Sequence, residues 1–250
     1  MLIDELLAHI FDSKPNLLAR PMAEWLTASR QFMAFATNFR DKIRKKVRTT
    51  QDQESLLDLQ LELETAYLLL QEKKLSVVYE PLQAGQTRCP DYAVSFTTSY
   101  TFMVEVTRLR AEQNDGNEED RPTAVKTPPT TQLIDERLAD TICSKLGQLL
   151  PQYSNVLVVG VESLVLTSDD LRAMMLYIQQ RAEQGDTIFL RRYRLRDRSS
   201  FFRTYQRLSE VLVRGSQMSA TRATAVWVNQ QAKHPLPSKV RTALYHSHNI

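Results

Sequence analysis

The run NVLVVGV at residues 155–161 is the feature that most restricts the fold of this 250-residue chain. It is apolar at nearly every position and is bounded by polar residues, a pattern typical of a β-strand buried on both faces. Residues 132–150, directly before it, carry apolar residues at helical spacing. A strand that follows a helical crossover lies parallel to a neighbour, so the pair predicts an α/β protein.

The chain upstream changes its apolar period from helical to alternating. Residues 54–74 carry a stripe of leucines at helical spacing, and three β-type runs follow at 75–79, 92–96 and 100–109. The central order is therefore helix, strand, strand, strand, helix, strand, and it predicts a mixed sheet.

The remaining segments are less regular. We expect a helical segment at 1–50, a main domain at 51–230 and a flexible tail at 231–250. Within the main domain, the sequence predicts a mobile, acidic, proline-bearing surface loop at 111–131. Beyond the buried strand it predicts a helix at 168–184, a basic segment, an amphipathic stretch near 200–214 and a last short strand that ends at 229.

Composition excludes several classes of protein. Six glycines and no glycine-rich motif argue against a phosphate-binding loop. Cys89 and Cys143 have neither disulfide-framework nor zinc-site spacing, so we expect small buried side chains in a reducing compartment. The N-terminus does not resemble a signal peptide, and no apolar run reaches the length of a membrane span, so we expect a cytoplasmic protein without a membrane partner. The four histidines form no catalytic or metal-binding pattern; His246 and His248 fall in the expected tail.

Three acidic residues stand out in chain order: Glu62 in the helix at 54–74, Asp91 at the start of the second strand, and Glu105 inside the third. Strand alternation places Met103, Glu105 and Thr107 on one face. If the second and third strands form a hairpin, Asp91 and Glu105 lie on adjacent strands and repel each other unless a cation lies between them. Mg²⁺ prefers such oxygen ligands. Taken singly, a strand glutamate is often a solvated edge residue, and Pro-Asp is common in turns.

The run YEPLQAGQTRCPDYAVSF followed by TFMVEVTRL resembles the core of the PD-(D/E)xK superfamily of restriction-endonuclease-like nucleases. Pro90-Asp91 matches the first motif, Glu105-Val106-Thr107 matches the E-x-K position, and Glu62 matches a glutamate that often precedes the core. The resemblance covers residues 54–162, and its motifs are short and degenerate. It implies an αβββαβ core.

The resemblance also implies a metal site. Asp91, Glu105 and the Val106 carbonyl would bind Mg²⁺ or Mn²⁺, which activates water for attack on a phosphodiester. Thr107 departs from the pattern, because the family usually has lysine there. Lys145, at the edge of the apolar stripe of the next helix, could supply the missing amine, with Gln148 one turn further on. The alternative is that Lys145 extends to solvent from an ordinary amphipathic helix.

Residues 189–208 are rich in arginine interleaved with aromatic residues, a combination that suits a phosphate backbone and unstacked bases. The arginines proposed to bind nucleic acid are Arg191, Arg192, Arg194, Arg196, Arg198 and Arg203, and the aromatic residues are Tyr193, Phe201, Phe202 and Tyr205. The alternative is a solvated basic face that balances the acidic loop.

The sequence therefore favours a Mg²⁺-dependent nuclease whose partner is nucleic acid, DNA before RNA, with a homodimer left open. Its catalytic residues would be Glu62, Asp91, Glu105, Thr107, Lys145 and Gln148. One alternative is an inactive member of the same superfamily that binds nucleic acid or a protein, and Thr107 is its main support. A helical interaction protein with an incidental strand acid fits the order of elements least well.

Overall fold

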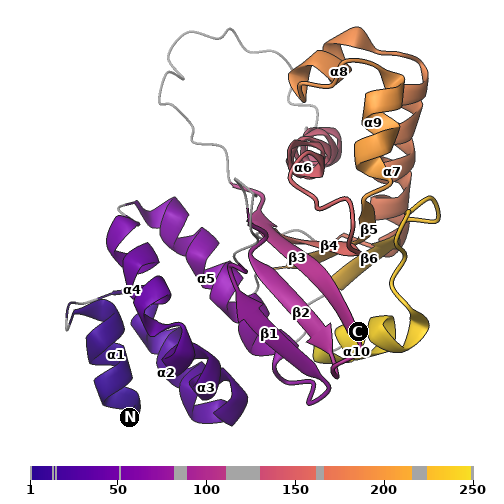
Figure 1. The fold of residues 1–250 in the computed structure, drawn as a ribbon. Helices are drawn as coiled ribbons and strands as arrows, with labels where there is room; N and C mark the ends of the chain where they lie inside the picture. The colour runs from indigo at the N-terminus through magenta and orange to yellow at the C-terminus, as the bar shows by residue number, and fades with distance from the viewer. Residues whose placement is uncertain are drawn as a thin grey trace, which may run out of the picture.

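The computed structural model describes residues 2–12, 14, 16–50, 52–81, 89–110, 130–161, 166–215 and 224–248, with the backbone alone at 130–135 and 224. Within these ranges the chain forms a six-stranded mixed sheet with helices on both faces (Figure 1). The helices are α1 Ile3–Phe11, α2 Ala19–Ala28, α3 Arg30–Asn38, α4 Arg40–Thr49, α5 Gln53–Leu69, α6 Thr130–Leu146, α7 Ser168–Glu183, α8 Thr187–Arg192, α9 Arg198–Tyr205 and α10 Ser238–Ser247. The strands are β1 Leu75–Tyr79, β2 Tyr92–Phe96, β3 Tyr100–Arg108, β4 Asn155–Val161, β5 Leu208–Gly215 and β6 Thr224–Val228.

The strands lie in the sheet in chain order, from β1 to β6. β1, β2 and β3 pair antiparallel, β4 lies parallel to β3 and to β5, and β6 pairs antiparallel with β5. The expected mixed sheet, the order of its central elements and the parallel fourth strand are therefore confirmed. Helix α6 makes the crossover that a parallel β3–β4 pair requires.

Alternate residues of β4 belong to two hydrophobic clusters, one on each face of the sheet. Val156 and Val158 pack with α5 and the N-terminal helices, whereas Leu157 and Val159 pack with α6 and α7. The prediction of burial on both faces is confirmed. Gly160 allows a close approach here, because a Cβ at this position would lie 2.5 Å from Cδ2 of Leu61 on α5.

The N-terminal helices share a core with the sheet. The ring of Phe35 on α3 lies 5.9 Å from that of Tyr79 on β1 and 6.4 Å from that of Tyr92 on β2. All three side chains are buried in one cluster with residues of α1, α2 and α5. The predicted helical character of residues 1–50 is confirmed, and this packing fixes α4 beside α5 and β1.

The prediction of a flexible tail at 231–250 is wrong for the residues of α10. Val240, Ala243 and Leu244 are buried against the same cluster as α5. Glu210 of β5 is fully buried and accepts hydrogen bonds from Arg241 Nε at 2.5 Å and Tyr245 Oη at 2.9 Å. A buried carboxylate needs such partners, and α10 supplies both.

Three further expectations are corrected in whole or in part, or fall outside the described residues. The stretch near 200–214 is not one amphipathic unit, since it contains most of α9 and most of the buried strand β5. The acidic loop at 111–131 lies outside the described residues up to 129, and Thr130 begins α6. Cys143 is buried as expected, but Cys89 is exposed. In the described part of the chain, no helix is long and apolar enough to cross a bilayer.

Candidate functional site

The candidate site lies at the start of β2, where β3 continues past its partner strand. The register pairs Tyr92 with Val104, so Glu105, Val106 and Thr107 extend past the first residue of β2. The Val106 N–H donates to Oδ2 of Asp91 at 2.7 Å, so this carboxylate replaces the carbonyl that a longer β2 would offer. The N–H and C=O of one strand residue point to the same side, and the Val106 carbonyl therefore faces the same gap.

Asp91 stands between two further carboxylates. Burial raises the pKa of Asp91 well above its ordinary value, and the negative charges of Glu62 and Glu105 raise it further. Glu62 belongs to α5 on one face of the sheet, and Glu105 belongs to β3. The structure thus brings together the three acidic residues that the sequence singled out.

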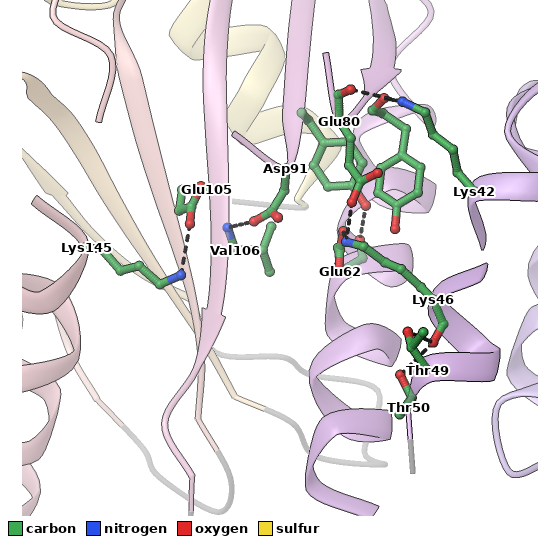
Figure 2. Close-up of polar contacts among 12 residues, drawn as sticks. Lys42, Lys46, Thr49, Thr50, Glu62, Glu80, Asp91, Glu105, Val106 and Lys145 are labelled. Atoms are coloured by element: carbon green, nitrogen blue, oxygen red, sulfur yellow. Dashed lines mark hydrogen bonds and ion pairs between the residues drawn. The ribbon is translucent and has the colours of Figure 1, made fainter. Parts of the chain in front are cut away.

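Lys145 reaches Glu105 from α6, as Figure 2 shows. Its Nζ lies 2.9 Å from Oε1 of Glu105, and the two side chains are 22% and 11% exposed. The expectation that Lys145 approaches this carboxylate is met, and the alternative in which it extends to solvent is not. Phe102, Val104 and Val106 face the cluster on the α5 side, so strand alternation directs Glu105 towards α6.

On the other side of Asp91, Glu62 is paired with a lysine from the N-terminal helices. Lys46 of α4 places its Nζ 2.6 Å from Oε1 of Glu62 and 3.0 Å from Oε1 of Glu80 (Figure 2). Burial raises the pKa of Glu62 despite the opposing charge of Lys46. For Lys46, burial acts to lower the pKa, but the charge and hydrogen bonds of Glu62 and Glu80 outweigh it and the pKa rises.

Two expected site residues form no hydrogen bond with these carboxylates in the part of the chain that the structure describes. Thr107 is half-buried on β3, and Gln148 lies in the turn after α6, where its N–H donates to the Lys145 carbonyl at 2.9 Å. Within the described residues, neither side chain forms a hydrogen bond with Asp91 or Glu105. Gln148 lies past the last helical residue, so the helical spacing used to place it beside Lys145 does not apply.

The oxygens at the gap suit a hard divalent cation, namely Asp91, Glu105 and the Val106 carbonyl. In the described part of the chain, no three His, Cys, Asp or Glu side chains gather in a group that could hold a metal ion. Any ion here would therefore rely on two carboxylates with a backbone carbonyl. His246 and His248 offer no such site, because His246 pairs with Glu72 at 2.9 Å while the ring of His248 is buried.

The arginine-rich segment forms α8, α9 and the turn between them. Phe201 and Tyr205 are buried in the core on the α6 side of the sheet, and the Tyr193 hydroxyl donates to Asp140 on α6. The expectation that these aromatic residues stack on bases is wrong for Phe201 and Tyr205, because their rings fill the core instead. Phe202 is half-buried, 5.7 Å from the Arg198 guanidinium.

Six arginines of this segment are exposed and are referred to below as the arginine surface. They are Arg191, Arg192, Arg194, Arg196, Arg198 and Arg203. Arg192 lies 2.5 Å from Asp140, so one end of the surface is attached to α6, the helix that carries Lys145.

The sequence alone does not place Lys46 or Glu80 at the site. The basic end of α4 was a detectable signal, but Lys46 lies 45 residues before Asp91 and the apolar pattern does not show which core residue it meets. Glu80 adopts a left-handed backbone conformation with φ of 43°, which only the folded chain reveals.

Comparison of the chain with protein-family models, curated proteins and solved structures found no match.

Proposed function

We propose that this protein is a metal-dependent nuclease with a restriction-endonuclease-like core formed by α5, β1, β2, β3, α6 and β4. The observation that carries the proposal is the 2.9 Å contact between Lys145 Nζ and Glu105 Oε1. It supports a lysine supplied by α6 in place of the one that Thr107 replaces in the motif. The order of the elements and the convergence of Glu62, Asp91 and Glu105 are consistent with the same proposal.

The donor set fits the cation that this chemistry needs. Asp91, Glu105 and the Val106 carbonyl would hold Mg²⁺ or Mn²⁺, since all three offer hard oxygen ligands beside the start of β2. A bound ion supplies a water of lowered pKa and polarises a phosphoryl oxygen. The partial burial of both carboxylates excludes bulk water, which strengthens electrostatic interactions within the site.

The protein side chains have separate roles in this proposal. The Lys145 ammonium neutralises negative charge that develops on the phosphoryl oxygens, and it stays ordered because Glu105 accepts its hydrogen bond. Thr107 cannot carry that charge. The arginine surface binds the phosphate backbone, and its contact with α6 links substrate binding to the helix that presents Lys145.

A second candidate is a catalytically inactive protein of the same fold that binds nucleic acid. The observation in its favour is that Glu105 and Glu62 already have ammonium partners, Lys145 and Lys46. Two of the three carboxylates are thereby neutralised by the chain itself, so the fold does not require a metal ion.

The test is cleavage of labelled single- and double-stranded DNA and RNA with Mg²⁺ or Mn²⁺. Wild type is compared with Asp91→Asn and Lys145→Met, and Lys45→Met, an exposed lysine of α4, is the matched control. The proposal expects metal-dependent cleavage that falls about 100-fold or more in both site variants and persists in the control. Salt-sensitive binding without cleavage of any substrate would favour the inactive protein instead.

A further inference from the structure

The Lys46 ammonium occupies a position surrounded by oxygen ligands. Besides its contacts of 2.6 Å with Glu62 and 3.0 Å with Glu80, it lies 4.9 Å from the centre of the Tyr79 ring. Its positive charge also acts on the pKa of Asp91. One ammonium therefore contacts carboxylates from α5 and from the end of β1, and its charge lowers the pKa of Asp91 at the start of β2.

A buried hydroxyl also faces this position. Tyr79 is fully buried, and its Oη has no hydrogen-bond partner of ordinary geometry among the described residues. Burial raises the pKa of Tyr79, and the charges of Glu62 and Glu80 raise it further, which places the ring beside both carboxylates. The hydroxyl interacts with Glu62, whose pKa it lowers, so Tyr79 lies against a carboxylate that the ammonium contacts.

The backbone is arranged to hold this position. Glu80 has φ of 43°, a conformation that costs a non-glycine residue about 1 kcal/mol. Its N–H donates to the Asp91 carbonyl at 2.8 Å, which fixes the ends of β1 and β2 together. Lys42, one turn before Lys46 on α4, donates to the carbonyls of Tyr79 and Glu80 at 3.0 Å each. The rigid surroundings of Lys46 are thus maintained by contacts that do not involve its ammonium.

We propose that Lys46 fills a second cation position, formed by Glu62 and Glu80 beside Asp91, and thereby takes the place of a second divalent ion. The inference rests on the proposed function, in which a first divalent ion binds between Asp91 and Glu105. The Lys46 ammonium contacts both carboxylates and so occupies the space between them that a divalent ion bridging Glu62 and Glu80 would need, and the two cations would repel each other at this distance. Lys145, by contrast, contacts one carboxylate through Oε1, so the other oxygen of Glu105 can bind an ion. The wild-type chain therefore takes up one divalent ion and gains another only when the ammonium is removed.

The experiment is a titration of the full chain with Mn²⁺, followed by isothermal calorimetry and by the electron paramagnetic resonance signal of free Mn²⁺. The wild type should bind one ion per chain, and Lys46→Met should bind two. The matched control is Lys45→Met, which removes an exposed ammonium from the same helix but frees no carboxylate of the site; its stoichiometry should equal that of wild type. Adding Glu80→Gln to Lys46→Met should abolish the gained ion.

The outcomes separate this inference from the proposed function. If wild type binds no ion and Lys46→Met binds one, the position between Asp91 and Glu105 is refuted, and the role of Lys46 stands. A stoichiometry that Lys46→Met leaves unchanged, or two ions in wild type, overturns the inference. If Lys46→Met lacks the native circular dichroism spectrum, Lys46→Gln, which retains a hydrogen-bond donor for Glu62, carries the same test.

Discussion

Removing the Lys145 ammonium should measurably destabilise the fold, independently of any catalytic role. Lys145→Met keeps a flexible side chain of similar length on α6, but it leaves Glu105 of β3 without its ion-pair partner. The same pair is broken from the other side by Glu105→Gln, which retains the shape of the side chain. The two variants and their combination form a double-mutant cycle.

The magnitude follows from the burial of the pair. With 22% and 11% of the two side chains exposed, the 2.9 Å contact is screened less than a surface ion pair. A hydrogen bond to a charged group stabilises a folded protein by about 1.5–3 kcal/mol. We therefore expect Lys145→Met to lower the free energy of unfolding by about 2 kcal/mol. For a chain of this size, that loss lowers Tm by roughly 4–8 °C.

The assay is urea unfolding followed by circular dichroism for wild type, both single variants and the double variant. The double variant should be about as stable as either single variant, which gives a coupling energy of about 2 kcal/mol. A cycle pairing Lys45→Met with Glu105→Gln is the control and should be additive. Additivity within about 0.5 kcal/mol in the Lys145 cycle would refute the contact.

Three other predictions test different parts of the molecule. Gly160→Ala should cost about 1–3 kcal/mol in urea unfolding because its Cβ would overlap Leu61, whereas Gly147→Ala, with open space around its Cβ, should not be destabilising. Burial, with the charge of Arg214, lowers the pKa of His248 to about 3, so the folded chain keeps this ring neutral while the unfolded chain protonates it below about pH 6.5. The contribution of His248 to the free energy of unfolding is therefore fully present above pH 7 and should fall by about 2 kcal/mol by pH 5. His248→Asn should remove this pH dependence. Arg196→Gln should make the slope of log K against log salt for nucleic-acid binding shallower by about 1; an unchanged slope would exclude Arg196 from the phosphate contacts.

The sequence determined the secondary structure of the central segment well because its signals are local. The bounds expected for β1, β2 and β4 agree with the structure, and the sheet was expected to be mixed. Apolar period distinguishes strand from helix without knowledge of the partners, and an acidic residue inside an apolar strand is conspicuous for the same reason. Asp91 and Glu105 could therefore be named before the fold was known.

The tertiary structure decided which distant residues meet. The aromatic rings of the arginine-rich segment were expected on the surface, yet Phe201 and Tyr205 lie in the core, since composition does not tell which side of a short helix faces the sheet. Residues of α10 were expected to be loose, but Arg241 and Tyr245 bind the buried carboxylate of Glu210, a need that only the buried strand creates.

The site shows the same division between local and long-range information. Lys145 could be anticipated because it lies at the edge of an apolar stripe on a helix that had to pack against the sheet. Lys46 could not, because its contact with Glu62 and Glu80 depends on how α4 packs beside α5 and β1. Local periodicity fixes the direction of a side chain relative to its own helix or strand, whereas the partner it reaches depends on the packing of the whole chain.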